Sequence, residues 1–370
     1  MATDGAGENA AEVKRVLDIC NACRYCEGFC ATFQVLSSRR KVEWSELDYL
    51  SNLCHNCTAC YHACQYSPPH EFNVNAPLAL SRLRAESYQR YAWPGFLGSM
   101  FQKNGLVVSL ATALILALTM LLGSTLVNRE ILLAQHQSPG AFYQVVSHEF
   151  IVASAGSIFL FAVLAMALGV SRFWGVSAGT KQFSLSALWG AFKSAATLNN
   201  LGGGHGQGCN TANESFSNKR RIFHQFTMWG FLLCFAATCS ATFYEYILGQ
   251  LSPFPYFSLP VVLGTAGGLG LLVGPAGLAW IKTRSDPRPM NLQQYGMDYA
   301  FLALLFLISL TGLVLLAFRE TAAMGVLLLI HLGFVFSFFV TLPYGKFVHG
   351  IYRFAALVMF YSEQHQNKDS

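Results

Sequence analysis

The chain has few charged residues and lacks several features of soluble enzymes. Only 12% of its 370 residues are charged, whereas 53% are hydrophobic, which is far from the composition of a soluble globular protein. The first ninety residues lack the basic segment and apolar core of a cleavable signal peptide, so none is expected. No glycine-rich nucleotide motif follows a strand pattern, and no nucleophile and base stand at a recognisable spacing. The chain is therefore not expected to carry out substrate chemistry of its own.

The apolar residues are gathered into long uncharged runs. A helix of about 20 apolar residues is long enough to cross a bilayer. Six such runs lie at residues 105–127, 150–170, 225–248, 259–281, 299–318 and 325–345. They predict six transmembrane helices.

The distribution of Lys and Arg predicts the orientation of these helices. Of the 24 such residues, 22 lie in the two terminal segments and in loops on the same side, and the opposite loops hold only Arg129 and Arg319. Because inside loops retain positive charge, both termini are expected in the cytoplasm of a cell whose inner membrane holds the chain. The net charge of +5 follows from this topology, so no nucleic-acid binding is expected.

Eight of the 11 cysteines form two identical runs near the N-terminus. Each run reads C-x2-C-x2-C-x3-C, and the runs begin at Cys20 and Cys54. This spacing places three thiolates on one iron–sulfur cube and sends the fourth to a neighbouring cube. If each run gives its fourth cysteine to the cluster of the other run, the chain holds two [4Fe–4S] clusters. One is predicted to be held by Cys20, Cys23, Cys26 and Cys64, the other by Cys54, Cys57, Cys60 and Cys30.

Thiolate quartets also bind zinc, which is the main alternative for these residues. Zinc ribbons usually join two C-x2-C pairs across a long spacer, whereas each run here places four cysteines within eleven residues. A disulfide framework is disfavoured because the predicted topology puts the thiols in the reducing cytoplasm. The proline that often follows the fourth cysteine is absent, since Ala31 and Gln65 occupy those positions.

Helical periodicity in the N-terminal region predicts an α-helical ferredoxin. Trp44, Leu47, Leu50 and Leu53 recur at helical spacing, and residues 76–91 form a helix-favouring stretch. The predicted fold class is mainly α, with this two-cluster head followed by a six-helix transmembrane bundle. The expected organisation is a disordered tail over 1–14, the ferredoxin over 15–95, a cytochrome b-like membrane domain over 100–355 and a cytoplasmic tail over 356–370.

Histidines at two depths of the predicted bundle are candidate axial ligands of haem b. His331 lies near the outer end of the sixth helix, and His349 lies near the inner surface. Matching by depth pairs His224 with His349 at the inner level and His148 with His331 at the outer level, for one or two haems. His136, in an outer loop, is an alternative to His148.

The separation of the two levels depends on whether the last helix is continuous. A continuous helix would place His331 and His349 about 27 Å apart, at about 1.5 Å per residue. Pro343 lies between them and is expected to kink or end the helix. Candidate cations for the haem propionates directly precede His224, namely Lys219, Arg220 and Arg221.

Three further features have mainly structural interpretations. The glycine-rich stretch 201–210 in an inner loop is a candidate for docking a partner or a quinone, and its cysteine stands singly. Cys234 and Cys239 are expected to be packing residues in an apolar helix. G-x-x-x-G spacings at 264/268 and 270/274 predict close helix packing.

Four segments carry a resemblance to a known family. They are the second cysteine run with the following QYSPPHEFNVNAPLAL, the segment from Glu86 to Pro94, the GGGHGQGCN loop, and RRIFHQFTMWGFLLCFAAT from Arg220 to Thr238. Together they resemble the tricarballylate/citrate utilisation protein B family, and the similarity extends from Cys20 to Tyr361. The resemblance implies a membrane electron carrier with two [4Fe–4S] clusters and haem b. Such a carrier reoxidises the reduced flavin of an FAD-dependent dehydrogenase, here expected to act on tricarballylate, and passes electrons to a membrane quinone.

Other classes of protein remain open at this stage. The chain could be the membrane subunit of a heterodisulfide- or succinate-reductase-like complex, or serve a cobalamin-biosynthesis flavoprotein, since a related region is fused to a flavoprotein in some such proteins. It could also be a membrane redox sensor without sustained turnover. Steady reduction of a quinone analogue by a reduced partner flavoprotein would exclude the sensor.

Overall fold

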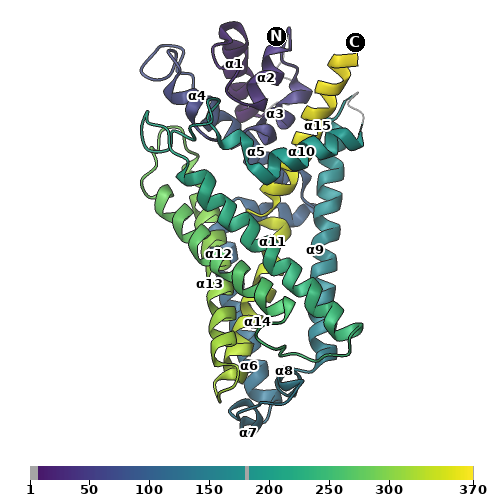
Figure 1. Cartoon of the computed structure of the whole chain (residues 1–370). Coiled ribbons are helices and arrows are strands. Elements are labelled where there is room, and N and C mark those ends of the chain that lie inside the picture. The colour runs from purple at the N-terminus through teal and green to yellow at the C-terminus, as the bar shows by residue number, and fades with distance from the viewer. Residues whose placement is uncertain (1–6, 180–182, 370) are drawn as a thin grey trace.

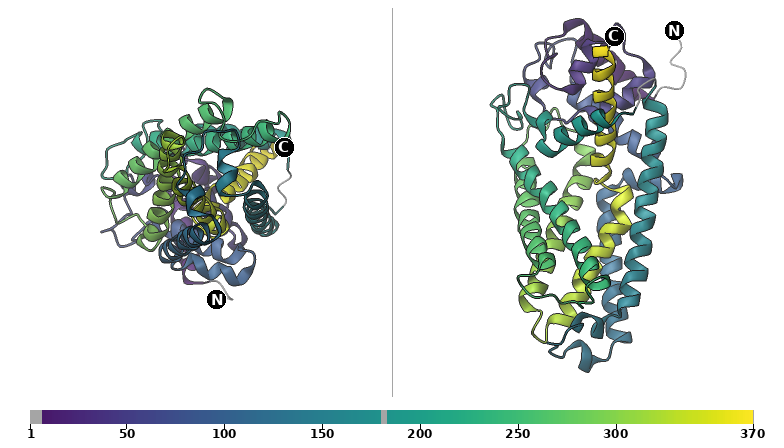
Figure 2. Two further views of the ribbon diagram at one scale, coloured as in Figure 1. Left: turned by 90° about the horizontal axis from the view of Figure 1, so that it is seen from below. Right: turned by 45° about the vertical axis from the view of Figure 1, so that its right-hand side comes forward.

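The computed structural model describes residues 7–179 and 183–369, and it is elongated and built from helices (Figure 1). A head of short helices lies at one end, and long helices extend from it as a bundle (Figure 2). Within the described residues there is no strand, and one isolated β-bridge joins Cys209 and Ser217. The predicted mainly α fold with a helical head is confirmed.

Short helices and connecting loops make up the head. They are α1 (Glu8–Cys23), α2 (Ala31–Ser37), η1 (Trp44–Glu46), α3 (Leu47–Leu53), α4 (Ala59–His62), α5 (Ala76–Tyr91) and η2 (Gly95–Phe101). The bounds of α5 agree with the helix-favouring stretch predicted from the sequence. Its first turn is fixed by the Asn75 side chain, which accepts a hydrogen bond from the backbone N–H of Leu78 at 3.2 Å.

Long helices form the membrane domain, and short ones connect them. They are α6 (Asn104–Leu126), α7 (Arg129–Leu132), α8 (Ala141–Val145), α9 (His148–Ser177), α10 (Leu185–Thr197), η3 (Asn199–Leu201), α11 (Lys219–Tyr246), α12 (Leu259–Lys282), η4 (Leu292–Gln294), α13 (Tyr295–Phe318), α14 (Met324–Thr341) and η5 (Leu342–Tyr344). Six spans among the described residues are long and apolar enough to cross a bilayer, as predicted. The chain is therefore a membrane protein.

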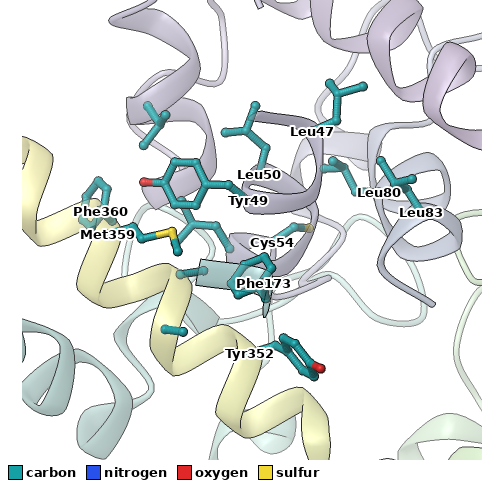
Figure 3. Packing of buried hydrophobic residues seen from close by; sticks show 14 of the residues in the cluster. Leu47, Tyr49, Leu50, Cys54, Leu80, Leu83, Phe173, Tyr352, Met359 and Phe360 are labelled. Atoms are coloured by element: carbon teal, nitrogen blue, oxygen red, sulfur yellow. The ribbon is translucent and has the colours of Figure 1, made fainter. Parts of the chain in front are cut away.

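The last helix, α15 (Val348–Asp369), joins the membrane domain to the head. Figure 3 shows Met359 and Phe360 of this helix beside Tyr49 of α3, and Tyr352 near Phe173 of α9. Met359 and Tyr49 are completely buried. Because one hydrophobic core contains residues of the head, α9 and α15, the head is packed onto the bundle rather than tethered to it.

The structure differs from the predicted disordered tail over 1–14 and shows that the predicted cytoplasmic tail is helical. Residues 1–6 lie outside the described part, but residues 8–14 belong to α1, where Val13 is fully buried in the head core. Residues 356–369 continue α15, and Leu357 is buried in the same core. The disordered tail was predicted from the polar composition of the first dozen residues, whereas burial of a few apolar residues fixes residues 8–14 and 356–369 as helices.

The chain breaks between the two levels of candidate haem ligands. Helix α14 ends at Thr341, and α15 begins at Val348. Pro343 has no N–H to continue the helical hydrogen bonds, and Gly345 is extended. The continuous helix considered from the sequence is therefore absent, and His331 and His349 lie on different helices.

Helices α11 and α12 approach each other closely through glycines. A Cβ atom on Gly274 would lie 2.4 Å from Oγ1 of Thr227, and one on Gly267 would lie 2.7 Å from Sγ of Cys234. Gly270 shares this face, whereas Gly268 faces Leu313 of α13. Of the two predicted G-x-x-x-G pairs, the pair at 270/274 thus lies at the α11–α12 contact.

Candidate cofactor sites

The first cavity of the head is lined by the cysteines predicted for one cluster. Its volume is about 240 Å3, and its walls include four thiol-bearing residues, Cys20, Cys23, Cys26 and Cys64. The first three lie at the end of α1 and in the following loop, and Cys64 follows α4. The structure therefore brings the fourth cysteine of the second run to the first run.

The second cavity contains the complementary set. It is smaller, about 20 Å3, and is lined by Cys30, Cys54, Cys57 and Cys60. Cys54 ends α3 and Cys30 precedes α2, while the left-handed backbone at Thr58 (φ 64°) turns the chain between Cys57 and Cys60. Because Cys60 lines both cavities, the two sites share a wall. A cube in the second site would push its walls outward.

The chemistry of these thiols suits a metal-bound role. Burial, together with neighbouring thiols, raises the pKa of Cys20 and Cys26 to about 12, so as free thiols they hold their protons near neutral pH. A bound metal releases these protons because only the thiolate is a ligand. Among the described residues, no three His, Cys, Asp or Glu side chains converge on one metal-ion position. The space in the first cavity suits a multi-atom cluster better than a single zinc ion.

The glycine-rich loop covers the second cavity. The backbone N–H of Ala31 donates a hydrogen bond to Oδ1 of Asn200 at 3.2 Å, just before this loop. A Cβ on Gly204 would lie 2.7 Å from Cα of Phe29, and Cys209 of the loop packs in one buried cluster with Cys57. The loop considered as a docking or quinone site therefore packs against the chain's own cysteines. The neighbouring positive φ of Gly203 and Gly204 explains the glycines there.

His224 and His349 meet at the head-side end of the membrane domain. Their ring centroids are 6.2 Å apart, and their planes are inclined by 77°. Two metal–imidazole bonds of about 2 Å each, plus about 1 Å from each nitrogen to its ring centre, add up to about 6 Å. The spacing thus fits two imidazoles on opposite sides of one iron.

The hydrogen bonds of this histidine pair leave nitrogens for a metal. Nδ1 of His349 is paired with the backbone carbonyl of Lys346, so its Nε2 is free to be a ligand. Nδ1 of His224 is buried and has no hydrogen-bond partner. Burial, with Arg353 and Lys346 nearby, holds the pKa of His349 well below its ordinary value. This keeps the imidazole neutral, which is the form that binds metals.

The far end of the bundle keeps its two candidate histidines apart. Nε2 of His148 lies 3.4 Å from Oε2 of Glu245, and Nδ1 of His331 lies 3.1 Å from Oγ1 of Thr311. No contact joins His148 to His331 in the part of the chain that the structure describes. His136, the alternative, is paired with the backbone carbonyl of Ile131. Depth alone suggested the pair, but His331 faces α13 and His148 faces the end of α11.

The three cations proposed for haem propionates diverge. Nζ of Lys219 lies 5.3 Å from the ring centroid of Trp280, and Arg221 donates to the carbonyl of Thr197 at 2.8 Å. Arg220 instead donates to the carbonyl of Asn56 at 2.5 Å, between the histidine pair and the second cavity. Only Arg220 is therefore directed toward the candidate sites.

Sequence reasoning missed two residues at the junction between the sites. Arg353 lies one helical turn after His349 on α15, and this i, i+4 spacing was a readable signal. His55, between Cys54 and Cys57, is buried, and its Nδ1 is 2.8 Å from the carbonyl of Leu53. Burial and the nearby Arg353 hold the pKa of His55 well below its ordinary value. Its burial and its arginine neighbours come from tertiary packing, so no sequence pattern pointed to it.

The thiol-lined head on six apolar spans defines a class of protein. It is a membrane protein with an iron–sulfur head suited to electron transfer. A family model described as Citrate utilization protein B matches residues 100–369, and one described as Citrate utilization protein B Fer4-like domain matches residues 13–90.

A curated relative gives the same result over almost the whole chain. Citrate utilization protein B of Escherichia coli is 46% identical over 365 residues, which cover 98% of this chain and 95% of the relative. The chain belongs to the citrate utilization protein B family. No solved structure matches it.

Proposed function

We propose that the protein takes electrons from the reduced flavin of a partner dehydrogenase and delivers them to a membrane quinone. The proposed partner is an FAD-dependent tricarballylate dehydrogenase, which binds the head on the cytoplasmic side of the inner membrane. Oxidation of the reduced flavin releases two electrons and two protons, and reduction of the quinone to quinol consumes two of each. This chain contributes the electron path and no substrate-binding chemistry.

The order of the candidate sites supports this proposal. The first thiol set would hold one [4Fe–4S] cluster and the second set another, and Cys60 lines both cavities. Arg220 and His55 then lie between the second set and the His224–His349 pair. When bound, the clusters and a haem b between these histidines supply one-electron redox chemistry.

The residues of this chain have separate tasks in the proposed path. The thiols fix the positions of the clusters, and the shared wall keeps those positions adjacent. The imidazoles of His224 and His349 would hold the haem, and the backbone carbonyl of Lys346 fixes the ring of His349. The observation that carries the proposal is the continuous series from the thiol-lined cavities to this histidine pair.

The test uses full-length protein purified anaerobically in detergent. We expect iron–sulfur absorbance at about 400 nm together with a reducible b-type haem band. Proteoliposomes supplied with reduced tricarballylate dehydrogenase should then reduce a quinone analogue with steady turnover. Absence of both cofactor signals would overturn the proposal, and cofactor signals without turnover would favour the redox sensor instead.

A further inference from the structure

Three arginine side chains converge on the turn that carries the second thiol set. Arg84 of α5 donates to the carbonyls of Cys54 at 2.7 Å and Ser51 at 3.1 Å. Arg353 of α15 donates to the same carbonyl of Cys54 at 3.1 Å. Arg220 of α11 donates to the carbonyl of Asn56 at 2.5 Å. These three residues, here called the arginine cluster, come from three different parts of the chain.

None of the three guanidinium groups has a carboxylate partner within the described residues. Arginines elsewhere in the head do have one, since Arg39 lies 2.6 Å from Glu363 and Arg90 lies 2.6 Å from Asp48. Arg84 is only 7% exposed, and Nε of Arg353 is buried without a hydrogen-bond partner. Buried cations that lack an anion are strongly destabilising. The arginine cluster is therefore balanced only by the backbone carbonyls that it contacts, so a negative group beside it would be stabilised.

The thiols of the second cavity are the nearest groups that can supply this negative charge. Arg353 interacts electrostatically with Cys54, and Arg220 interacts with Cys57. Four thiolates give an iron–sulfur cube a net negative charge, and each added electron makes it more negative. Nearby cations stabilise the reduced form and raise the reduction potential, because potential follows net charge and surroundings.

The first cavity has no comparable buried cation among the described residues, because Arg24, in the loop between Cys23 and Cys26, is exposed and donates to the backbone carbonyl of Asn21 at 3.1 Å. The groups that act on Cys20, Cys26 and Cys64 are other cysteines and backbone N–H groups, together with burial. The cations of α1 are already paired, as Lys14 is with Asp18 at 2.5 Å. The two thiol sets thus share a ligand pattern but differ in their electrostatic surroundings.

We propose that the arginine cluster gives the second iron–sulfur centre a higher reduction potential than the first and so directs electrons from the head toward His224 and His349. This inference rests on the proposed function, and it adds the order of the potentials and the residues that set it. Arg84, Arg220 and Arg353 are positioning residues, since each acts on the cluster through charge. The reaction at each step is the transfer of one electron between neighbouring centres, with no bond made or broken in the protein.

The experiment is a redox titration of the full-length protein followed by electron paramagnetic resonance. A Cys23→Ala variant, which loses a first-set ligand, identifies the signal of the second centre. We expect Arg84→Gln to lower the reduction equilibrium constant of that centre about tenfold, which corresponds to about 59 mV for one electron. The first centre should not change. Arg84→Lys should restore most of the shift, because it retains the charge.

The matched control is Arg82→Gln, an exposed position on the same helix, which should leave both potentials unchanged. Equal potentials of the two centres in the wild type, or no change of the second centre in Arg84→Gln, would overturn the inference while leaving the proposed function intact. Absence of cluster signals in the wild type would overturn the proposed function and the inference with it.

Discussion

The two ends of the membrane domain contain the same type of side chain in different settings. At the head-side end, the rings of His224 and His349 are 6.2 Å apart, and the cations Arg353 and Lys346 lie near His349. At the far end, His148 is next to Glu245, and His331 is hydrogen-bonded to Thr311. Among the described residues, the histidines of matched depth therefore come together at the head-side end and lie apart at the far end.

The break in the chain after α14 creates this difference. Because α14 ends at Thr341 and α15 starts at Val348, His349 lies on a separate helix from His331 and contacts His224 of α11. No comparable break occurs near His331, which stays in the middle of α14 and faces α13. The structure therefore brings together one of the two histidine pairs predicted from the sequence, His224 with His349.

Removal of one imidazole at the head-side end is expected to have the largest effect. His349→Ala should abolish the low-spin b-type haem band, since one axial ligand is lost. The matched control is His331→Ala, which should retain the full band. Reduced-minus-oxidised spectra of purified protein measure both. A band halved in each variant would instead indicate two haems and contradict the comparison.

Overpacking of the α11–α12 contact is expected to have the next largest effect. Gly274→Leu should destabilise the protein by about 1–3 kcal/mol and reduce haem content, because the new side chain would collide with Thr227, one helical turn from His224. Thermal unfolding monitored by haem absorbance provides the measurement.

The control for this variant is Gly264→Ala on the same helix. A Cβ there would lie 3.6 Å from Cβ of Ala237, which is an ordinary contact. Its stability and haem content should remain close to the wild type. Equal losses in the two variants would show that the predicted clash does not position His224.

The loop over the second cavity is expected to control access to the thiols. Gly204→Ala would place a methyl group 2.7 Å from Cα of Phe29 and should displace the loop. The second iron–sulfur signal should then decay several-fold faster in air. Gly206→Ala is a matched control, since its φ is also positive (74°) but no atom lies within 4 Å of the new Cβ. Similar decay in both variants would assign the effect to backbone strain.

The smallest effect is expected at Lys219, whose cation points away from the His224–His349 pair. Lys219→Gln should leave the haem potential unchanged, because Nζ of Lys219 lies over Trp280. Arg353→Gln should lower the haem potential, because this cation faces His349. Spectroelectrochemical titration compares the two variants. A larger shift of the haem potential in Lys219→Gln than in Arg353→Gln would instead support the sequence-based prediction that Lys219 lies beside the haem propionates.

Local patterns predicted much of this molecule. The spacing of the cysteines in 20–30 and 54–64 predicted which thiols line each cavity. The prediction succeeded because the short turns between the cysteines fix where their side chains lie. Uncharged runs predicted the membrane spans for a similar reason, since bilayer thickness sets their length. The pairing of His224 with His349 followed from depth, and the proline between the levels made it possible.

Contacts between distant segments were beyond the reach of such patterns. The packing of the glycine-rich loop on Phe29 and of α15 on Tyr49 depends on how whole helices are placed. The structure shows no contact between His148 and His331 within the described residues, and depth alone does not report which way a ring faces. The approach of Arg84, Arg220 and Arg353 to one turn likewise joins segments that are separated in sequence.

The central claim is that the head holds two iron–sulfur cubes in series with one haem. Its most direct test is the metal and cofactor content of anaerobically purified full-length protein. The account predicts about eight non-haem irons with matching acid-labile sulfide, and about one haem per chain. Zinc in place of iron, or a chain without haem, would contradict it.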